Sequence, residues 1–184
     1  DEVVERLEEA CLKAKRVFIF GNGGSAATAS HFASDLAKGA ICPGKPRIKA
    51  FALTDNMALF SAWANDTTYE NVFAEQLENF IEPRDIAIGI SGSGNSLNTL
   101  NGVKVAKAKG ATTIGFIGFG GGKLKELGGD EDPEFLVTII EQFIQDASVH
   151  VETLRGATES GDARVLERSA HTLKSSSANM GALV

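Results

Sequence analysis

The chain has only two cysteines among its 184 residues, Cys11 and Cys42, and they form no metal-binding or redox motif. We therefore expect two free thiols, as in proteins of a reducing cytoplasm. The chain also lacks any apolar run close to the roughly 20 residues of a membrane-spanning helix, and no signal peptide is visible. A cytoplasmic protein with no membrane partner is expected.

The chain has fewer basic than acidic residues. The 18 Lys and Arg are outnumbered by 24 Asp and Glu, which gives a net charge of −6. Binding to nucleic acid requires clustered Lys and Arg, so nucleic acid is not expected as a partner. The composition, 43% hydrophobic and 23% charged, is that of an ordinary globular protein with one domain or two small ones.

Glycine, in contrast, is concentrated in two loops. The first lies in residues 16–38, RVFIFGNGGSAATASHFASDLAK, where an apolar run ends at Gly21-Asn22-Gly23-Gly24-Ser25 and a helical pattern follows. A strand, a glycine turn and a helix start form a cradle for a phosphate, because the backbone can approach closely and free N–H groups point at the anion. Ser25 adds a hydroxyl and is expected to cap the helix.

The second loop has the same arrangement, at residues 85–96, DIAIGISGSGNS. It offers hydroxyl groups and backbone amides around one concavity with no bulky side chain. The hydroxyls are those of Ser91, Ser93 and Ser96, and the amides are those of Gly92, Gly94 and Asn95. Two such loops in successive β-α units predict a small phosphorylated ligand held between strand ends, whereas a turn without a ligand is the simpler alternative.

Alternating apolar runs and helical patterns predict an α/β fold with a doubly wound parallel sheet, whose ligands bind beyond the carboxyl ends of the strands. The expected strands are residues 17–20, 47–54, 85–91 and 112–117. The expected helices are residues 1–15, 24–38, 56–64, 69–80 and 96–109.

The pattern changes near residue 130. From Phe135 onward the apolar spacing is helical, residues 160–162 break it, and a further helix begins near Ala163. No strand is expected after residue 117. The sequence thus predicts two domains, residues 1–130 and an all-α helical segment at residues 131–184.

The motifs of the first part resemble the SIS (sugar isomerase) domain, and within it the phosphoheptose isomerases, which act on sedoheptulose 7-phosphate. The resemblance rests on GNGGSAATASHFASDL, on ISGSGNS and on Asn65-Asp66 between them. It implies a sugar-phosphate ligand, with Asn22 and Ser25 in the sugar site beside Gly23 and Gly24, the second loop holding the phosphate, and Asp66 bonding sugar hydroxyls. It also implies a homo-oligomer, a dimer or a tetramer.

His31 and Asp35 stand four residues apart and share one helix face. In the family this pair is a metal-binding His and a catalytic Glu. Here Asp35 is one methylene shorter, and we take it as the candidate general base. The resemblance implies zinc, with Gln142 and His150, eight residues apart, as further ligands. An ordinary surface pair at positions 31 and 35 is the alternative.

Residues 131–184 resemble a histidine phosphotransfer (HPt) domain through the motif HTLKSSSANMGA at residues 171–182. The resemblance implies that His171 accepts a phosphoryl group from the aspartyl phosphate of a response-regulator receiver domain. Lys174 one turn away offsets the incoming charge, and Asp162 suits the start of the helix. The family is a four-helix bundle, whereas two helices at most are expected here.

Three functions follow from these patterns. The first is binding of a sugar phosphate with aldose–ketose isomerisation. The second is a phosphorelay adaptor that works through His171. The third is a non-catalytic interaction protein built on the SIS fold.

Overall fold

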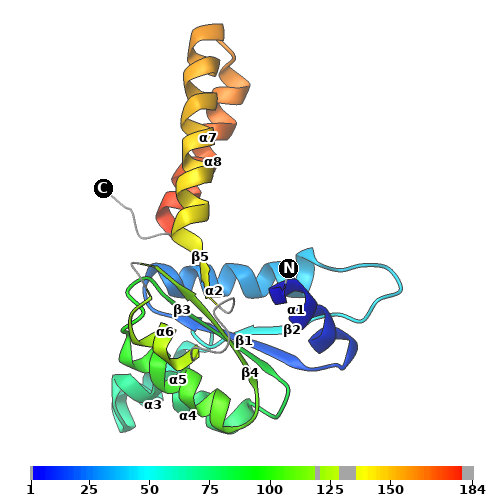
Figure 1. Cartoon of the computed structure of the whole chain (residues 1–184), viewed down its shortest axis with the longest axis vertical. Coiled ribbons are helices and arrows are strands. Elements are labelled where there is room, and N and C mark those ends of the chain that lie inside the picture. Colours follow the sequence, from blue (N-terminus) through cyan, green and yellow to red (C-terminus); the bar gives the residue numbers. More distant parts are fainter. Residues whose placement is uncertain (1, 119–120, 129–135, 180–184) are drawn as a thin grey trace. The chain divides into compact units, whose positions relative to one another are not determined.

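The computed structural model describes residues 2–118, 121–128 and 136–179, with side chains described at residues 148–173 of the last range. Five strands form one sheet in the order β2-β1-β3-β4-β5 (Figure 1). They are β1 (Arg16–Gly21), β2 (Lys49–Ala52), β3 (Ile86–Ser91), β4 (Thr112–Ile117) and β5 (Leu136–Thr138). Strands β2, β1, β3 and β4 pair in parallel, which confirms the predicted α/β class.

The helices alternate with these strands. In the first part of the chain they are α1 (Glu2–Leu12), α2 (Gly24–Ser34), α3 (Met57–Asp66), α4 (Val72–Phe80), α5 (Leu97–Ala108) and α6 (Gly122–Gly128), with a π-helical turn η1 (Asp35–Gly39) and a 3₁₀ turn η2 (Tyr69–Asn71). Helix α2 lies on one face of the sheet, and α4 and α5 lie on the other (Figure 1). The helices therefore cover both faces, as the doubly wound prediction required.

The core lies between the sheet and the α4–α5 layer. Phe18 and Phe20 of β1 pack with Phe73 of α4 and Leu100 of α5. The alternate residues of β1 are buried as well, since Val17 and Ile19 are 0% exposed. A central parallel strand that is buried on both faces reads as a continuous apolar run, and this run produced the strand prediction.

The prediction that no strand follows residue 117 was wrong. Strand β5 (Leu136–Thr138) joins the sheet beside β4. Its three residues, Leu-Val-Thr, also fit the start of the helical spacing that follows, so the strand was read as helix. The prediction that no strand precedes the last helices was therefore also wrong.

Two further differences concern helices. The expected helix 24–38 is α-helical only to Ser34 and continues as the π-helical turn η1. Helix α6 (Gly122–Gly128) was not predicted, because its seven residues begin with glycine and carry little periodicity.

The chain forms two compact units, Asp1–Val137 and Thr138–Val184. The second holds α7 (Ile139–Ser160) and α8 (Ala163–Asn179), which pack against each other. Asp162 lies at the start of α8 as expected, and it also caps the helix, because its Oδ1 accepts from the backbone N–H groups of Arg164 and Val165, both at 3.1 Å. Among the described residues, no helix has the length and apolar character needed to cross a membrane.

Candidate functional site

The two glycine loops lie at the same end of the sheet, beyond the carboxyl ends of the strands. Strands β1 and β3 are neighbours in parallel register, with Gly21 opposite Ile90, and each loop follows the carboxyl end of its strand. At Gly21 the chains come so close that a Cβ would stand 2.7 Å from the Ile90 carbonyl oxygen. Glycine is therefore required here, because any side chain would push the two strand ends apart.

A pair of side-chain amides joins the first loop to the helix that follows the second loop. Asn22 Nδ2 donates to Asn98 Oδ1 at 2.8 Å, and Asn98 Nδ2 donates back to Asn22 Oδ1 at 2.8 Å. The Tyr69 hydroxyl also donates to Asn22 Oδ1, at 3.0 Å. Asn98 is only 3% exposed. These contacts fix the orientation of the Asn22 amide at the mouth of the first loop.

The second loop is held by its own hydrogen bonds. Ser91 Oγ donates to Ser96 Oγ at 3.2 Å, the Asn95 N–H donates to Ser93 Oγ at 3.2 Å, and the Gly94 N–H donates to the Ser91 carbonyl at 3.1 Å. Ser91 is buried, whereas Gly92, Ser93 and Asn95 are exposed. The exposed Gly92 and Ser93 next to the N-terminus of α5 form a surface suited to an anion.

The loop around residue 94 packs tightly against the segment before α6. Gly94 has a φ of +65°, and a Cβ on it would stand 1.8 Å from the Gly121 carbonyl oxygen. The Leu124 N–H donates to the Gly94 carbonyl at 2.9 Å, and the Lys123 N–H donates to Asn95 Oδ1 at 3.1 Å. The start of α6, absent from the sequence prediction, thus supports the second loop.

The first loop enters α2 through Gly23, which is the N-cap residue with a φ of 55° and no side-chain cap. The expectation that Ser25 caps this helix was therefore wrong, because Ser25 lies inside the first turn. Its N–H donates to the Asn22 carbonyl at 3.0 Å. Gly23 is exposed and Gly24 is half-buried, so the backbone of this turn is open to a ligand.

His31 and Asp35 share one face as expected. His31 Nε2 lies 3.4 Å from Asp35 Oδ2, and the two side chains are 74% and 65% exposed. Asp35 is also the first residue of the π-helical turn η1, where the Ala40 N–H donates to the Asp35 carbonyl at 2.8 Å. The pair is accessible to a substrate, which a general base requires.

These two residues do not form a zinc site by themselves. Zinc takes three or four protein ligands, and among the described side chains no group of three His, Cys, Asp or Glu could hold a metal ion. His150 belongs to the second unit, and so does Gln142, whose side chain lies outside the described residues. The four-ligand zinc site stays a prediction, and no proposed step uses a metal.

Asp66 is the last residue of α3, and its Oδ1 accepts from Asn65 Nδ2 at 2.8 Å. Both side chains are exposed. The neighbouring amide thus orients the carboxylate and leaves it open to solvent. Its predicted role toward sugar hydroxyls stays a prediction.

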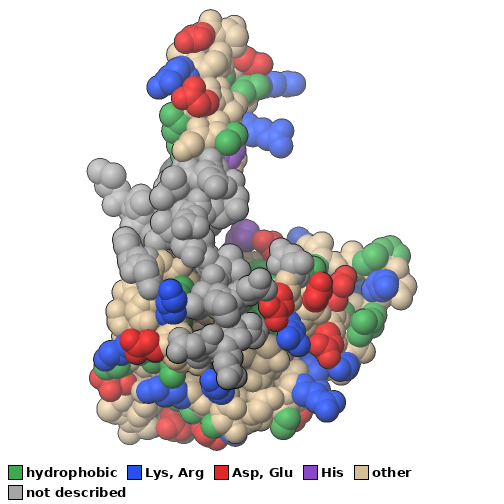
Figure 2. Space-filling view, in the orientation of Figure 1, with side chains coloured by type: hydrophobic (Ala, Val, Ile, Leu, Met, Phe, Trp, Pro, Cys, Tyr) green, Lys and Arg blue, Asp and Glu red, His purple; other side chains and the backbone are tan. Residues whose placement is uncertain are grey.

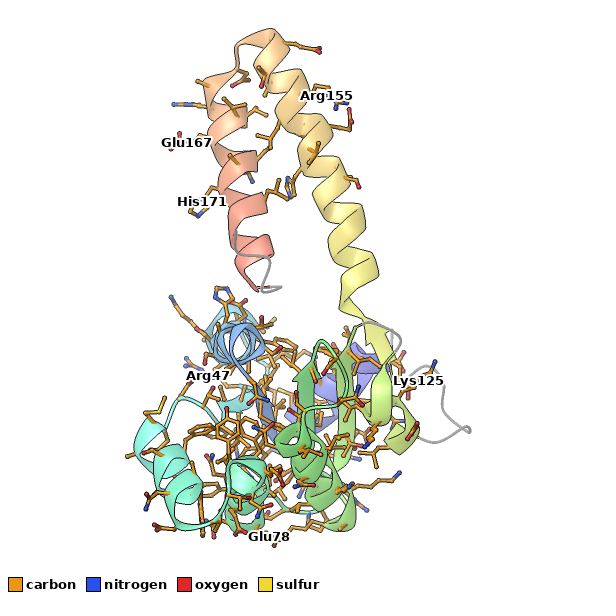
Figure 3. The ribbon with its side chains drawn as sticks, turned by 90° about the vertical axis from the view of Figure 1, so that its left-hand side faces the viewer. Arg47, Glu78, Lys125, Arg155, Glu167 and His171 are labelled. Atoms are coloured by element: carbon orange, nitrogen blue, oxygen red, sulfur yellow. The ribbon has the colours of Figure 1, made fainter. Side chains whose placement is uncertain are left out.

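In the second unit, His171 lies on α8 and is exposed. Figure 3 shows His171 and Glu167 on the side of α8 that points away from α7. This placement leaves the imidazole open to a partner. The side chain of Lys174 lies outside the described residues.

Tyr69 and Asn98 were not among the predicted site residues. Asn98 follows the GSGNS motif by two residues, and its amide was the only signal that the sequence offered. Tyr69 stands 47 residues from Asn22, its hydrogen-bond partner, and such a contact leaves no trace in local spacing. Both residues extend the candidate site toward η2 and α5.

Comparisons with known proteins agree with this geometry. The SIS domain model matches residues 1–118, and the Hpt domain model matches residues 138–183. A phosphoheptose isomerase of Crocosphaera subtropica is 38% identical over 153 residues, which are 83% of this chain and 76% of that protein. One from Aquifex aeolicus is 44% identical over 112 residues, 61% of this chain and 58% of that protein.

Solved structures show the same likeness. A phosphoheptose isomerase from Francisella tularensis superposes with a TM-score of 0.67 at 28% identity, covering 74% of this chain and 71% of that one. Another, from Neisseria gonorrhoeae, has a TM-score of 0.65 at 30% identity, covering 73% and 68%. The chain belongs to the SIS domain family, as a relative of the phosphoheptose isomerases that carries an Hpt domain match in its C-terminal helices.

Proposed function

We propose that the first unit binds a sugar phosphate at its two glycine loops and interconverts the aldose and ketose forms, with sedoheptulose 7-phosphate as the substrate that its relatives suggest. The observation that carries the proposal is the amide pair of Asn22 and Asn98, which ties the first loop to the first turn of the helix that follows the second loop, at the carboxyl ends of the strands. Ligands of open α/β sheets bind at this end.

In this proposal the phosphate lies against the second loop. Gly92 and Ser93 are exposed beside the N-terminus of α5, and the backbone N–H of Gly92 and the Ser93 hydroxyl are the donors proposed for the phosphate. Such groups favour a dianion without a basic side chain. The sugar then extends toward the first loop, where Asn22 keeps one orientation because Tyr69 and Asn98 both bind its amide.

The Asp35 carboxylate acts as general base. It removes a proton from the carbon next to the carbonyl, which leaves an enediolate, and the protonated carboxyl group then delivers a proton to the neighbouring carbon. The carbonyl oxygen gains a proton, the adjacent hydroxyl loses one, and no oxidant or reductant is consumed. His31, 3.4 Å from Asp35, holds the carboxylate in position.

Exchange of substrate hydrogen in D₂O tests this directly, because the proton on the Asp35 carboxyl group exchanges with solvent and deuterium is then delivered to the sugar carbon. We expect incorporation by the parent chain and a loss of at least about 100-fold in Asp35→Asn, the usual size of a general-base contribution. Ser34→Ala, at an exposed neighbouring position, is the matched control. Arms with added zinc and with EDTA reveal any metal requirement.

The outcomes separate binding from catalysis. Thermal stabilisation by the sugar phosphate that is lost in Ser93→Ala, without deuterium incorporation, would support the third alternative, a non-catalytic SIS protein. Neither stabilisation nor incorporation at millimolar ligand would overturn the whole proposal. Equal incorporation in Asp35→Asn would transfer the base role to another residue.

A second function is favoured by the exposed imidazole of His171 on α8. An imidazole nitrogen attacks the phosphorus of a receiver's aspartyl phosphate, a P–N bond forms, and the P–O bond to the aspartate breaks. The receiver recovers its carboxylate, and the imidazole releases its N–H proton to water. Phosphate label should transfer to the parent chain and to His150→Gln, but not to His171→Gln; no transfer from several receivers would count against this function.

We also propose a homo-oligomer and a cytoplasmic protein, in line with the resemblance and with two cysteines that are free. Light scattering of the full chain tests the first point. A dimer or tetramer is expected, and a strict monomer would contradict it.

A further inference from the structure

A cavity lies at the opposite end of the sheet, where the strands begin. It has a volume of about 330 Å³, and its walls include Ile86, the first residue of β3, and Thr112, the first residue of β4. The glycine loops follow the opposite ends of the strands. A six-residue strand spans roughly 20 Å, so the cavity is separate from the candidate sugar site.

The cavity is basic in a protein that is acidic overall. Four cationic side chains line it, Arg6, Lys13, Lys15 and Arg84, together with one carboxylate, that of Glu9. Figure 2 shows Lys and Arg side chains gathered over the end of α1, at the lower right of the first unit. The lining thus carries a net charge of three positive units, whereas the whole chain carries −6.

The acid in the cavity neutralises only part of this charge. Glu9 pairs with Lys13, and its Oε2 lies 3.9 Å from Arg6 Nη1. Arg6 also pairs with Glu2 at 3.1 Å. In the part of the chain that the structure describes, Lys15 and Arg84 have no carboxylate within 4.0 Å. Two of the cavity's cations, Lys15 and Arg84, are therefore outside any ion pair among the described residues.

Two tight turns of the backbone position Lys15 and Arg84. Ala14 and Arg84, with φ of 54° and 68°, are the residues other than glycine that have positive φ in the described part of the chain. Both lie in the segments that line the cavity, because Ala14 separates Lys13 from Lys15. Glycine would adopt this conformation without strain. Ala14 closes the end of α1, where the Lys15 N–H donates to the Ala10 carbonyl at 2.8 Å, and Arg84 is the third residue of a turn closed by the bond from the Asp85 N–H to the Glu82 carbonyl at 3.1 Å. These turns set the positions of Lys15 and Arg84 at the cavity.

We propose that this cavity binds a small molecule through a diphosphate group. Guanidinium groups match phosphate oxygens in a bidentate fork, and the ammonium groups add point charges without a fixed geometry. The volume is at the lower end of small-molecule sites, which suits a compact polyanion. Inorganic pyrophosphate and the diphosphate of a nucleotide present the same chemistry.

Titration calorimetry on the full chain tests the proposal with three probes: pyrophosphate, ADP and adenosine. We expect pyrophosphate and ADP to bind and adenosine not to bind. Tighter binding of ADP than of pyrophosphate identifies a nucleotide as the natural type of ligand, and equal binding identifies the inorganic anion. Binding should weaken at least tenfold when salt is raised from about 0.05 M to about 0.5 M, because the contacts are ionic.

Variants assign the binding to this cavity. Lys15→Gln and Arg84→Gly should each weaken pyrophosphate binding at least tenfold; glycine at position 84 suits the positive φ, so this variant should fold. Lys104→Gln removes an exposed lysine from α5 and serves as the charge control. Ser93→Ala tests the glycine loop and should leave pyrophosphate affinity within twofold.

Three results would overturn the proposal. The first is no pyrophosphate binding at a concentration on the order of 10 mM, which would saturate a site with a millimolar Kd. The others are unchanged affinity in both cavity variants and a loss of affinity confined to Ser93→Ala. The last result would assign the anion to the glycine loop. None of these results bears on deuterium exchange by Asp35, so the two proposals stand or fall separately.

Discussion

Asn22 and Asn98 exchange two hydrogen bonds of 2.8 Å between their side-chain amides. The pair spans 76 positions in the sequence and connects the loop after β1 to the start of α5, the helix that follows the loop after β3. Neither amide can rotate without losing both bonds, so each residue fixes the donor and acceptor pattern that the other presents. The candidate sugar site depends on this mutual orientation.

We therefore expect Asn98→Ala to lower the free energy of unfolding by about 1–3 kcal/mol, the cost of leaving a partly buried amide without its partner. Sugar-phosphate binding should weaken at the same time, because Asn22 is freed to rotate. Urea denaturation and ligand-dependent melting measure the two effects. Asn101→Ala, on the same helix but bonded to Glu70 and Asn71, should leave the ligand affinity unchanged.

A methyl group at Gly94 should disrupt the second loop. Its Cβ would stand 1.8 Å from the Gly121 carbonyl oxygen, so the loop and the start of α6 must separate. We expect Gly94→Ala to cost more than about 2 kcal/mol of stability, as overpacking and backbone strain add. Gly44→Ala is the control: its φ of +77° is also positive, but nothing lies within 4 Å of the new Cβ, and a loss of only about 1 kcal/mol is expected.

The capping of α8 gives a prediction for the second unit. Asp162→Ala removes the acceptor for the N–H groups of Arg164 and Val165 and should cost about 1 kcal/mol locally. Hydrogen exchange at those two amides is the measurement, since global unfolding of the first unit would not report the change. Asp162→Asn, which caps as well as Asp, should retain the protection; a loss equal to that of Asp162→Ala would show that charge matters more than the cap.

The pKa of Glu9 is held below its ordinary value, first by the hydrogen bond from Lys13 and then by the positive charge of Lys13. A lowered pKa in the folded state means that the ionised form contributes stability above the unfolded pKa, and that this contribution disappears as the pH falls through the folded pKa. NMR titration of the Glu9 carboxyl carbon should give a midpoint that rises in Lys13→Gln. An unchanged midpoint would show that other charges dominate.

Arg84→Gly should separate stability from binding. Glycine adopts the φ of 68° without the penalty of roughly 1 kcal/mol that other residues incur, so the variant should unfold at higher urea than the parent. Its loss of pyrophosphate affinity would then arise from the missing guanidinium and not from unfolding. A variant that is less stable than the parent would show that the Arg84 side chain contributes more to folding than its backbone strain costs.

The strands could be predicted where buried apolar runs are long. Thr112–Ile117 was predicted to the residue, because six consecutive residues between a turn and a glycine segment fit only a strand. Leu136–Thr138 was missed, since three residues are too few to distinguish a period of two from a helical period. Local pattern therefore sufficed for the central strands and failed at the short edge strand.

The candidate site also contains residues that could be predicted from local pattern and residues that could not. The glycine loops could be found because close backbone approach demands glycine at fixed positions, as at Gly21 and Gly94. Tyr69 and Asn98 were not found, because their role comes from contacts with Asn22 across the fold. The basic cavity could not be predicted for a related reason. Lys15 and Arg84 are brought together by the pairing of β1 with β3. The negative net charge of the whole chain gave no indication of a local basic cluster.

The π-helical turn Asp35–Gly39 has a consequence for how this region could have arisen. A π turn contains one residue more than the α-helical path it replaces, and such extra residues are retained mainly where function needs them. Here the extra residue begins at the carboxylate that pairs with His31. Deleting one residue, such as Ala37, would return the chain to regular winding and turn every later side chain of the segment by about 100° around the axis. The extra residue therefore changes the direction of the side chains that follow on the way to β2, whereas Asp35, at the start of the turn, keeps its direction.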